Sequence, residues 1–160
     1  MPSIIYDIAI IGGGASGLAA AIAAARTGAR VLVIERDVEA GLPLLATGNG
    51  RCNLSNEDLD PTHYLHPGIA SHVMGPTPER DIADFFASLG LIMTSTDGRL
   101  YPITRRAESV RDVLLDACAR EGANLECACT PAAARYDEET STWSLECQRP
   151  ARPLKAKAGA

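Results

Sequence analysis

Three glycines with GxGxxG spacing are the first residues that could do chemistry. Gly12, Gly14 and Gly17 follow a β-branched run and precede an alanine-rich stretch. In a strand–turn–helix segment the first glycine allows the turn, the second lets a phosphate approach the backbone, and the third lets the helix pack closely. The N–H groups near Ala15 and Ser16 would then point at the phosphates, because a helix N-terminus attracts anions.

An acidic residue lies where the ribose of a dinucleotide would need an acceptor. Glu35 ends a second apolar run, about 20 residues after the glycines, and a carboxylate there can accept both ribose hydroxyls. The adjacent Arg36 joins it as a candidate. Glutamate favours FAD over NAD at this position, and its charge disfavours NADP, whose 2′-phosphate it would repel. The alternative is a structural turn that binds no nucleotide. In that case the strand, the glycines, the helix of small residues and the acid at the end of the second strand would all match the dinucleotide-binding pattern by chance.

These residues need a particular scaffold. The pattern predicts a strand over residues 4–11 that is buried on both faces, a helix over 15–26 and a second strand over 30–34. Together they would form a right-handed βαβ unit with parallel strands. A third parallel strand is expected over residues 124–129, and a hairpin over 132–137 and 142–147.

The middle of the chain has other patterns. Residues 41–56 are rich in glycine and asparagine and predict a loop, and residues 60–78 predict irregular or short helical structure. Further elements have clear periodicity or turn signals: we expect helices over 79–89 and 107–121, and short strands over 91–93 and 99–101. The fold class is therefore α/β, a Rossmann-like FAD-binding domain with a parallel sheet and an antiparallel hairpin or meander, forming one domain over residues 1–160.

Residues 44–56, LLATGNGRCNLSN, carry a resemblance to a known family. They resemble the signature of bacterial NAD(P)/FAD-dependent oxidoreductases, flavoproteins described as aminoacetone-oxidase-like or bile-acid-reductase-like. Residues 98–104, GRLYPIT, and the following 107–114 are similar to a second stretch of that family. The resemblance covers essentially the whole chain and implies non-covalent FAD, with NAD(P)H as electron donor. It also implies that the rest of the FAD domain and the substrate domain are absent, so we expect weak FAD binding and little turnover.

The signature loop offers further candidates for the cofactor site. Gly48 and Gly50 would allow close backbone approach, and Arg51 could neutralise a pyrophosphate or favour an anionic reduced flavin. The alternative for Arg51 is a structural ion pair. Asn53 could hydrogen-bond the flavin edge or brace the loop. For Cys52 a buried packing role is favoured over a redox role, since no resolving cysteine lies nearby in sequence.

The sequence departs from the family pattern at two places. Leu42-Pro43 stands where many relatives carry a lysine, so any contact of that lysine is lost. Pro131 aligns with a position whose backbone N–H clamps adenine in relatives, and proline can offer only its carbonyl. We keep Pro131 among the candidate cofactor residues.

Composition excludes several other functions. The 160 residues carry a net charge of −5, which argues against nucleic-acid binding. No apolar helix is long enough for a membrane span, and we expect a cytoplasmic protein with five reduced cysteines. The three histidines have no metal-site spacing, so no metal ligand is predicted. No constellation of catalytic residues is recognisable, and the catalytic residues are left unassigned.

The leading hypothesis is an FAD-dependent oxidoreductase acting on a small-molecule substrate. Two alternatives stay open at this point: a flavin-binding module or fragment without turnover, and an NAD-binding dehydrogenase-type domain. A bound yellow chromophore would exclude the NAD-binding dehydrogenase-type domain. Bleaching of that chromophore by NADH or NADPH would exclude a flavin-binding module without turnover.

Overall fold

The computed structural model describes residues 5–150, so Ile4 of the expected first strand lies outside the described residues. The chain divides into two compact units: residues 5–43 with 114–150 form unit 1, and Leu44–Val113 form unit 2. The assignment of the whole chain to one FAD-binding domain stays a prediction.

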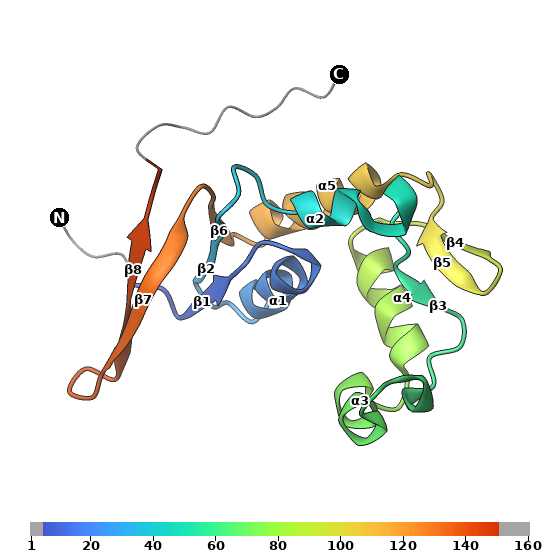
Figure 1. Cartoon of the computed structure of the whole chain (residues 1–160), viewed down its shortest axis with the longest axis horizontal. Coiled ribbons are helices and arrows are strands. Elements are labelled where there is room, and N and C mark those ends of the chain that lie inside the picture. Colours follow the sequence, from blue (N-terminus) through green and yellow to red (C-terminus); the bar gives the residue numbers. More distant parts are fainter. Residues whose placement is uncertain (1–4, 151–160) are drawn as a thin grey trace. The chain divides into compact units, whose positions relative to one another are not determined.

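Unit 1 contains the expected βαβ unit. Strands β1 (Ile8–Ile11), β2 (Val31–Ile34) and β6 (Asn124–Glu126) form a parallel sheet in the order β1-β2-β6, and α1 (Ala15–Ala25) connects the first two (Figure 1). The Rossmann-like α/β fold class is therefore confirmed. The core is apolar and its largest fully buried members include residues of α1, β2 and the end of the helix α5 (Ala107–Arg120): Leu18, Ile22, Val31, Val33, Leu114 and Cys118.

The expectation that the first strand is buried on both faces is wrong. Strand β2 is central and mostly buried, whereas β1 pairs only with β2 among the described residues. The side chains of Ile8 and Ile11 are 40% and 62% exposed. A run of β-branched residues indicates a strand, but it does not reveal how many other elements cover that strand. The pattern therefore predicts more burial for β1 than the structure has.

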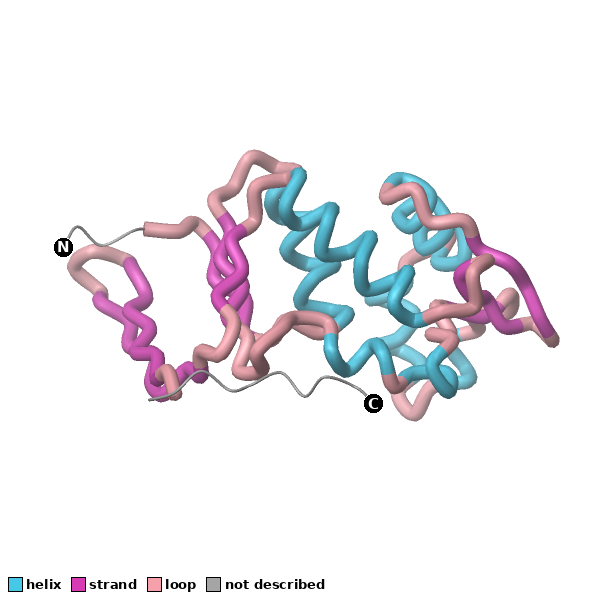
Figure 2. The backbone as a smooth tube through the Cα atoms, turned by 90° about the horizontal axis from the view of Figure 1, so that it is seen from above, coloured by secondary structure: helices cyan, strands magenta, loops and turns pink. Residues whose placement is uncertain are grey.

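The third strand is shorter than expected, and ends at Glu126 instead of residue 129. Ala128 has a positive φ of 51°, which turns the backbone out of the sheet, and its N–H donates to the carbonyl oxygen of Asp37 over 2.7 Å. The next element is a separate antiparallel hairpin, β7 (Thr130–Asp137) and β8 (Thr142–Gln148), which Figure 2 shows apart from the parallel sheet. This confirms the predicted hairpin.

Unit 2 combines short helices with a small antiparallel sheet. The sheet has the order β3-β5-β4, with β3 at Ser55–Asn56, β4 at Met93–Thr96 and β5 at Arg99–Pro102. The helices are α3 (Pro67–Met74), α4 (Pro78–Ser88) and the first residues of α5, and a 3₁₀ turn covers Pro61–His63.

The segment 41–56 is more regular than the predicted loop. It holds the short helix α2 (Leu42–Leu45), a 3₁₀ turn over Thr47–Gly50 and strand β3. The pairing of β3 with β5 explains the difference, because Ser55 lies opposite Leu100, far along the chain, and local composition cannot reveal such a partner.

Candidate dinucleotide-binding site

The glycine turn between β1 and α1 has the geometry that its spacing predicts. Gly12 has a φ of +101°, a conformation that favours glycine, and its N–H donates to the carbonyl oxygen of Ile34 over 2.8 Å. A Cβ added to Gly17 would lie 1.9 Å from the carbonyl oxygen of Gly12. The first turn of α1 therefore lies directly against the turn, which only glycine at position 17 permits.

Gly14 is the N-cap of α1 and faces open space. A Cβ built on it would meet no atom within 4 Å, so the protein itself does not require glycine there for packing. Its φ of −78° is open to any residue. The open space beside Gly14 would let a ligand approach the backbone closely.

The start of α1 is suited to an anion. The first N–H groups of a helix, here those of Ala15, Ser16 and Gly17, have no intrahelical acceptor. No side chain caps them, and the first turn carries no acidic residue. The helix dipole adds partial positive charge at the same end, so a phosphate can accept these N–H groups.

Glu35 connects the end of β2 to the glycine turn. Its Oε2 accepts the N–H of Gly13 over 2.6 Å, and its Oε1 accepts the N–H of Asp37 over 2.9 Å. The residue is only 7% exposed. A carboxylate has about four acceptor sites, so each oxygen keeps one for a further donor such as a ribose hydroxyl.

The backbone of Glu35 is held as firmly as its side chain. Its N–H donates to the backbone carbonyl oxygen of Glu126 in β6 over 2.9 Å, and its carbonyl oxygen accepts the N–H of Cys129 over 2.9 Å. Arg36, the neighbouring candidate, is exposed, and its guanidinium lies 4.0 Å from the carboxylate of Asp37.

Gly13 is a residue of the site whose role the sequence pattern did not single out. A Cβ on Gly13 would lie 2.8 Å from the Cβ of Ala40 and 3.2 Å from Oε2 of Glu35. Its carbonyl oxygen also accepts the N–H of Gly41 over 2.7 Å. The middle glycine is thus required by packing. Only the run of three glycines in the sequence could have hinted at this.

Cys127 lies near the carboxylates of this region and is poorly suited to be a nucleophile. Burial raises the pKa of its thiol, and the negative charges of Glu35, Glu126 and Glu39 raise it further. The thiol therefore stays protonated and weakly reactive near neutral pH.

The signature loop lies in unit 2 and is tightly wound. Gly48, Asn49, Gly50 and Cys52 all have positive φ angles, between 54° and 77°. The N–H of Cys52 closes the turn onto the carbonyl oxygen of Thr47 over 3.1 Å.

Close packing and burial distinguish the residues of this loop. A Cβ on Gly48 would lie 2.8 Å from the backbone nitrogen of Asn53. Cys52 is 3% exposed, whereas Arg51 and Asn53 are exposed. These positions fit a packing role for Cys52 and leave Arg51 accessible to a ligand.

Pro131 belongs to β7 and pairs with Cys147 of β8, next to a bulge. Its role at an adenine site stays a prediction. The structure therefore brings together the glycine turn, the start of α1 and Glu35 within unit 1, and the signature loop within unit 2.

Among residues 5–150, no group of three His, Cys, Asp or Glu side chains is arranged to hold a metal ion. No helix within the same residues is both long and apolar enough to cross a membrane.

The fold and the glycine turn define a Rossmann-type domain. Residues 6–152 match the model of the HI0933-like protein Rossmann domain, and the chain belongs to that family. This confirms the resemblance carried by the signature loop.

Two curated relatives share this region. The 3-dehydro-bile acid delta(4,6)-reductase of Clostridium scindens is 47% identical over 111 residues, covering 67% of this chain and 27% of the relative. The ribosomal RNA dihydrouridine synthase of Escherichia coli is 30% identical over 118 residues, covering 72% of this chain and 29% of the relative. The chain thus spans less than a third of the length of either protein.

Solved structures share the fold at low sequence identity. The 3-ketosteroid-delta4-(5alpha)-dehydrogenase of Rhodococcus jostii aligns with a TM-score of 0.67 at 15% identity, over 92% of this chain and 42% of that one. A flavocytochrome c3 fumarate reductase aligns with a TM-score of 0.59 at 16% identity, over 86% and 29% of the two chains.

Proposed function

We propose that unit 1 binds the adenosine diphosphate part of FAD, and that the chain serves an FAD-dependent oxidoreductase. The observation that carries this proposal is the double role of Glu35. Its carboxylate is fixed against the phosphate-binding turn by the N–H of Gly13 and keeps acceptor capacity for ribose hydroxyls. A carboxylate held beside a glycine turn is the arrangement that a dinucleotide needs.

The residues of unit 1 fit such a cofactor at three points. The N–H groups at the start of α1 would hold the pyrophosphate, and the open space at Gly14 would admit it. Glu35 would orient the adenosine ribose. The flavin, when bound, supplies the hydride chemistry. These side chains bind and orient, and we assign none of them a proton-transfer role.

We further propose NAD(P)H as the electron donor and a small molecule as the substrate. The relative at 47% identity is named as a reductase of a 3-dehydro bile acid, and the relative at 30% identity is named for ribosomal RNA. The higher identity of the first favours a small-molecule substrate over a nucleic acid. The net charge of −5 favours the same choice. A cytoplasmic location is part of this proposal, because all five cysteines are free.

The test is an FAD titration of the purified chain, followed by flavin fluorescence. Glu35→Gln removes the charge and one acceptor, so FAD affinity should fall by at least about tenfold, which corresponds to roughly 1.4 kcal/mol. Glu39→Gln changes an exposed carboxylate close by in sequence and should leave the affinity within about twofold.

Two outcomes would contradict the proposal. Equal FAD affinity in the Glu35 and Glu39 variants would remove Glu35 from the site. Preferential binding of NAD over FAD would favour a dehydrogenase-type domain. Anaerobic addition of NADH or NADPH to the flavin complex then separates an oxidoreductase, whose flavin bleaches, from a binding module, whose flavin does not.

A further inference from the structure

Three arginines of unit 2 differ from all other described arginines. Arg51, Arg99 and Arg105 form no ion pair with a carboxylate of residues 5–150, whereas every other arginine in that range does. All three lie on or beside strand β5. A protein with a net charge of −5 therefore keeps an unneutralised positive cluster at one place.

Two of these arginines share one aromatic ring. The guanidinium carbon of Arg51 lies 5.2 Å from the ring centre of Tyr101, and that of Arg105 lies 5.5 Å from it. Tyr101 is only 4% exposed, so the ring is a fixed platform. Arg99 is two residues before Tyr101 on β5 and points to the same face of the strand.

Local hydrogen bonds hold both guanidinium groups in place. Nε of Arg51 donates to the carbonyl oxygen of Gly48 over 3.2 Å, and Nη2 of Arg105 donates to Oγ1 of Thr96. Arg105 has a positive φ of 55°, and its N–H donates to the carbonyl oxygen of Pro102 over 2.8 Å. Both side chains are therefore largely ordered before any ligand arrives, which lowers the entropy lost on binding.

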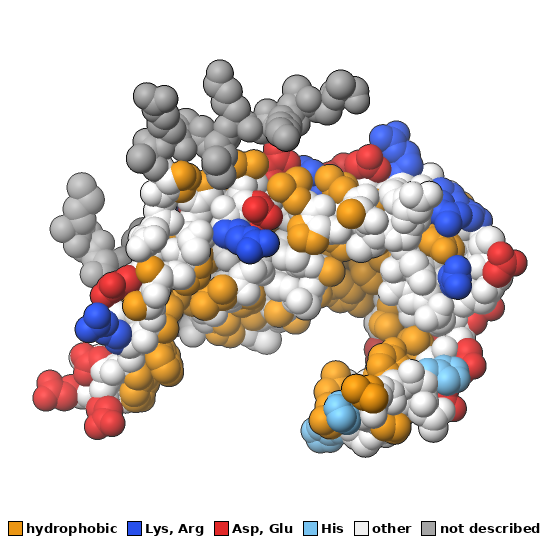
Figure 3. Space-filling model, viewed as in Figure 1, with side chains coloured by type: hydrophobic (Ala, Val, Ile, Leu, Met, Phe, Trp, Pro, Cys, Tyr) orange, Lys and Arg blue, Asp and Glu red, His pale blue; other side chains and the backbone are white. Residues whose placement is uncertain are grey.

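Most of the donor capacity of these side chains is unused. A guanidinium has five N–H donors. Within the described residues, the guanidinium of Arg51 and that of Arg105 each donate one hydrogen bond. The remaining donors have the fork geometry that matches phosphate oxygens. Figure 3 shows basic side chains gathered over the part of unit 2 that carries β4 and β5.

We infer that Arg105 joins Arg51 on the Tyr101 ring to form a binding site for a phosphate group of a dinucleotide. The inference rests on the proposed function only for the dinucleotide that carries the phosphate. Two sources share this chemistry: the pyrophosphate of NADH or NADPH and the 2′-phosphate of NADPH. Arg105 and Tyr101 are additional to the cofactor residues predicted from the sequence.

The first experiment maps protection of arginines in the unaltered chain. Phenylglyoxal modifies accessible arginines, and peptide mass spectrometry gives a rate for each one, with and without inorganic pyrophosphate. Pyrophosphate should slow modification of Arg51 and Arg105 by at least about fivefold, and change Arg106 by less than about twofold. Arg106 is a matched control, because it is adjacent and already paired with Glu108 at 3.7 Å. Equal slowing at all three arginines, or at none, would overturn the inference.

The second experiment identifies the source of the phosphate. FAD, NADH and NADPH are each titrated by calorimetry against the unaltered chain, Arg105→Gln and Arg106→Gln. The Arg105 variant should weaken the binding of NADPH, alone or together with NADH, by at least about tenfold, and the Arg106 variant should weaken none of the three ligands. Loss of both nicotinamide nucleotides assigns their pyrophosphate, and loss of NADPH alone assigns its 2′-phosphate. Loss of FAD alone would overturn the inference.

Unchanged affinity for both NADH and NADPH in Arg105→Gln would overturn the inference. That failure is distinct from a failure of FAD binding by unit 1, which depends on Glu35 and is measured with FAD alone. Thermal melting of each variant checks that the fold persists. If Arg105→Gln does not fold, the protection experiment on the unaltered chain decides alone.

Discussion

Oε2 of Glu35 accepts the backbone N–H of Gly13 over 2.6 Å, which joins the end of β2 to the turn before α1. The sequence pattern assigns these two residues to different tasks, ribose binding and chain reversal. Their hydrogen bond couples the two tasks, because the carboxylate of Glu35 stabilises the turn that would hold the phosphates. Substitution of Glu35 therefore affects the protein even without a ligand.

The first prediction concerns this brace in the ligand-free chain. Glu35→Ala removes the acceptors of two backbone N–H groups, those of Gly13 and Asp37, and leaves the first of them buried. We expect the free energy of unfolding to fall by roughly 2–4 kcal/mol. Glu35→Gln keeps one acceptor and should lose about half as much. Urea denaturation followed by circular dichroism measures both, and equal stability of all three proteins would rule the brace out.

The second prediction concerns the packing of Gly13. Gly13→Ala places a Cβ 2.8 Å from the Cβ of Ala40, so the free energy of unfolding should fall by about 1–3 kcal/mol. Ala40→Gly in the same chain removes the clash, so the double variant should be more stable than the sum of the two single changes predicts. Gly14→Ala is the control, since its Cβ meets nothing within 4 Å. Additive losses would contradict the packing argument.

The glycine turn and Glu35 could be predicted from sequence because both depend on short-range patterns. Gly12 needs a positive φ, and the alternation of strand, turn, helix and strand fixes where the acid falls. The hairpin and the helices followed from periodicity in the same way.

The remaining features depend on partners far along the chain. The tight packing of Gly13 comes from Ala40, the pairing of β3 comes from β5, and the end of β6 depends on Ala128 bonding to Asp37. No local window contains both members of such a pair. The contact between Arg105 and Tyr101 could not be predicted for another reason, although the two residues are close in sequence. It depends on the positive φ of Arg105, which is uncommon for a residue other than glycine and leaves no pattern in the sequence.

The third prediction concerns the open space at Gly14. Gly14→Val adds a branched side chain where no protein atom lies within 4 Å, so the ligand-free fold should be retained. The same side chain blocks the approach of a pyrophosphate to the start of α1, so FAD affinity should fall by at least about a hundredfold. Flavin content after purification and a fluorescence titration measure this. Normal flavin stoichiometry in the variant would place the phosphate site elsewhere.

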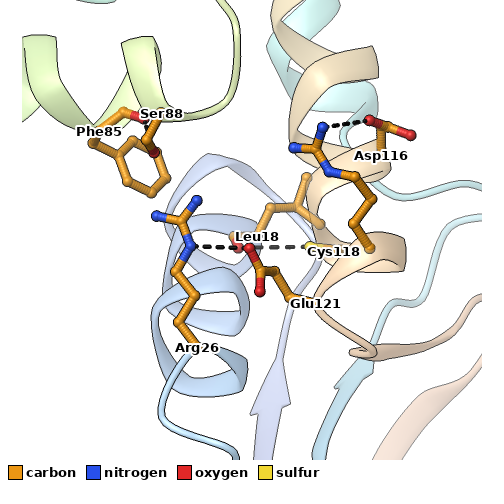
Figure 4. Close-up of polar contacts among 8 residues, drawn as sticks. Leu18, Arg26, Phe85, Ser88, Asp116, Cys118 and Glu121 are labelled. Atoms are coloured by element: carbon orange, nitrogen blue, oxygen red, sulfur yellow. Dashed lines mark hydrogen bonds and ion pairs between the residues drawn. The ribbon is translucent and has the colours of Figure 1, made fainter.

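The fourth prediction concerns Cys118, a fully buried thiol on α5 within unit 1. Figure 4 shows its sulfur directed at the carbonyl oxygen of Leu18 on α1, 3.7 Å away. Burial raises the pKa of this thiol from an ordinary value of 9.0 to about 11. The folded protein therefore holds its proton at a pH where the unfolded chain releases it.

The sign of the resulting pH dependence follows from proton binding. Below pH 9 both states hold the proton, and Cys118 contributes its full stability. As the pH rises from about 9 to about 11, the unfolded chain loses the proton first, so the free energy of unfolding falls by roughly 2 kcal/mol. Cys118→Ala removes this contribution but keeps the other thiols and tyrosines. Denaturation curves at several pH values should therefore show a smaller decline for the variant than for the unaltered chain. Parallel declines would mean that Cys118 ionises as readily in the folded state as in the unfolded chain.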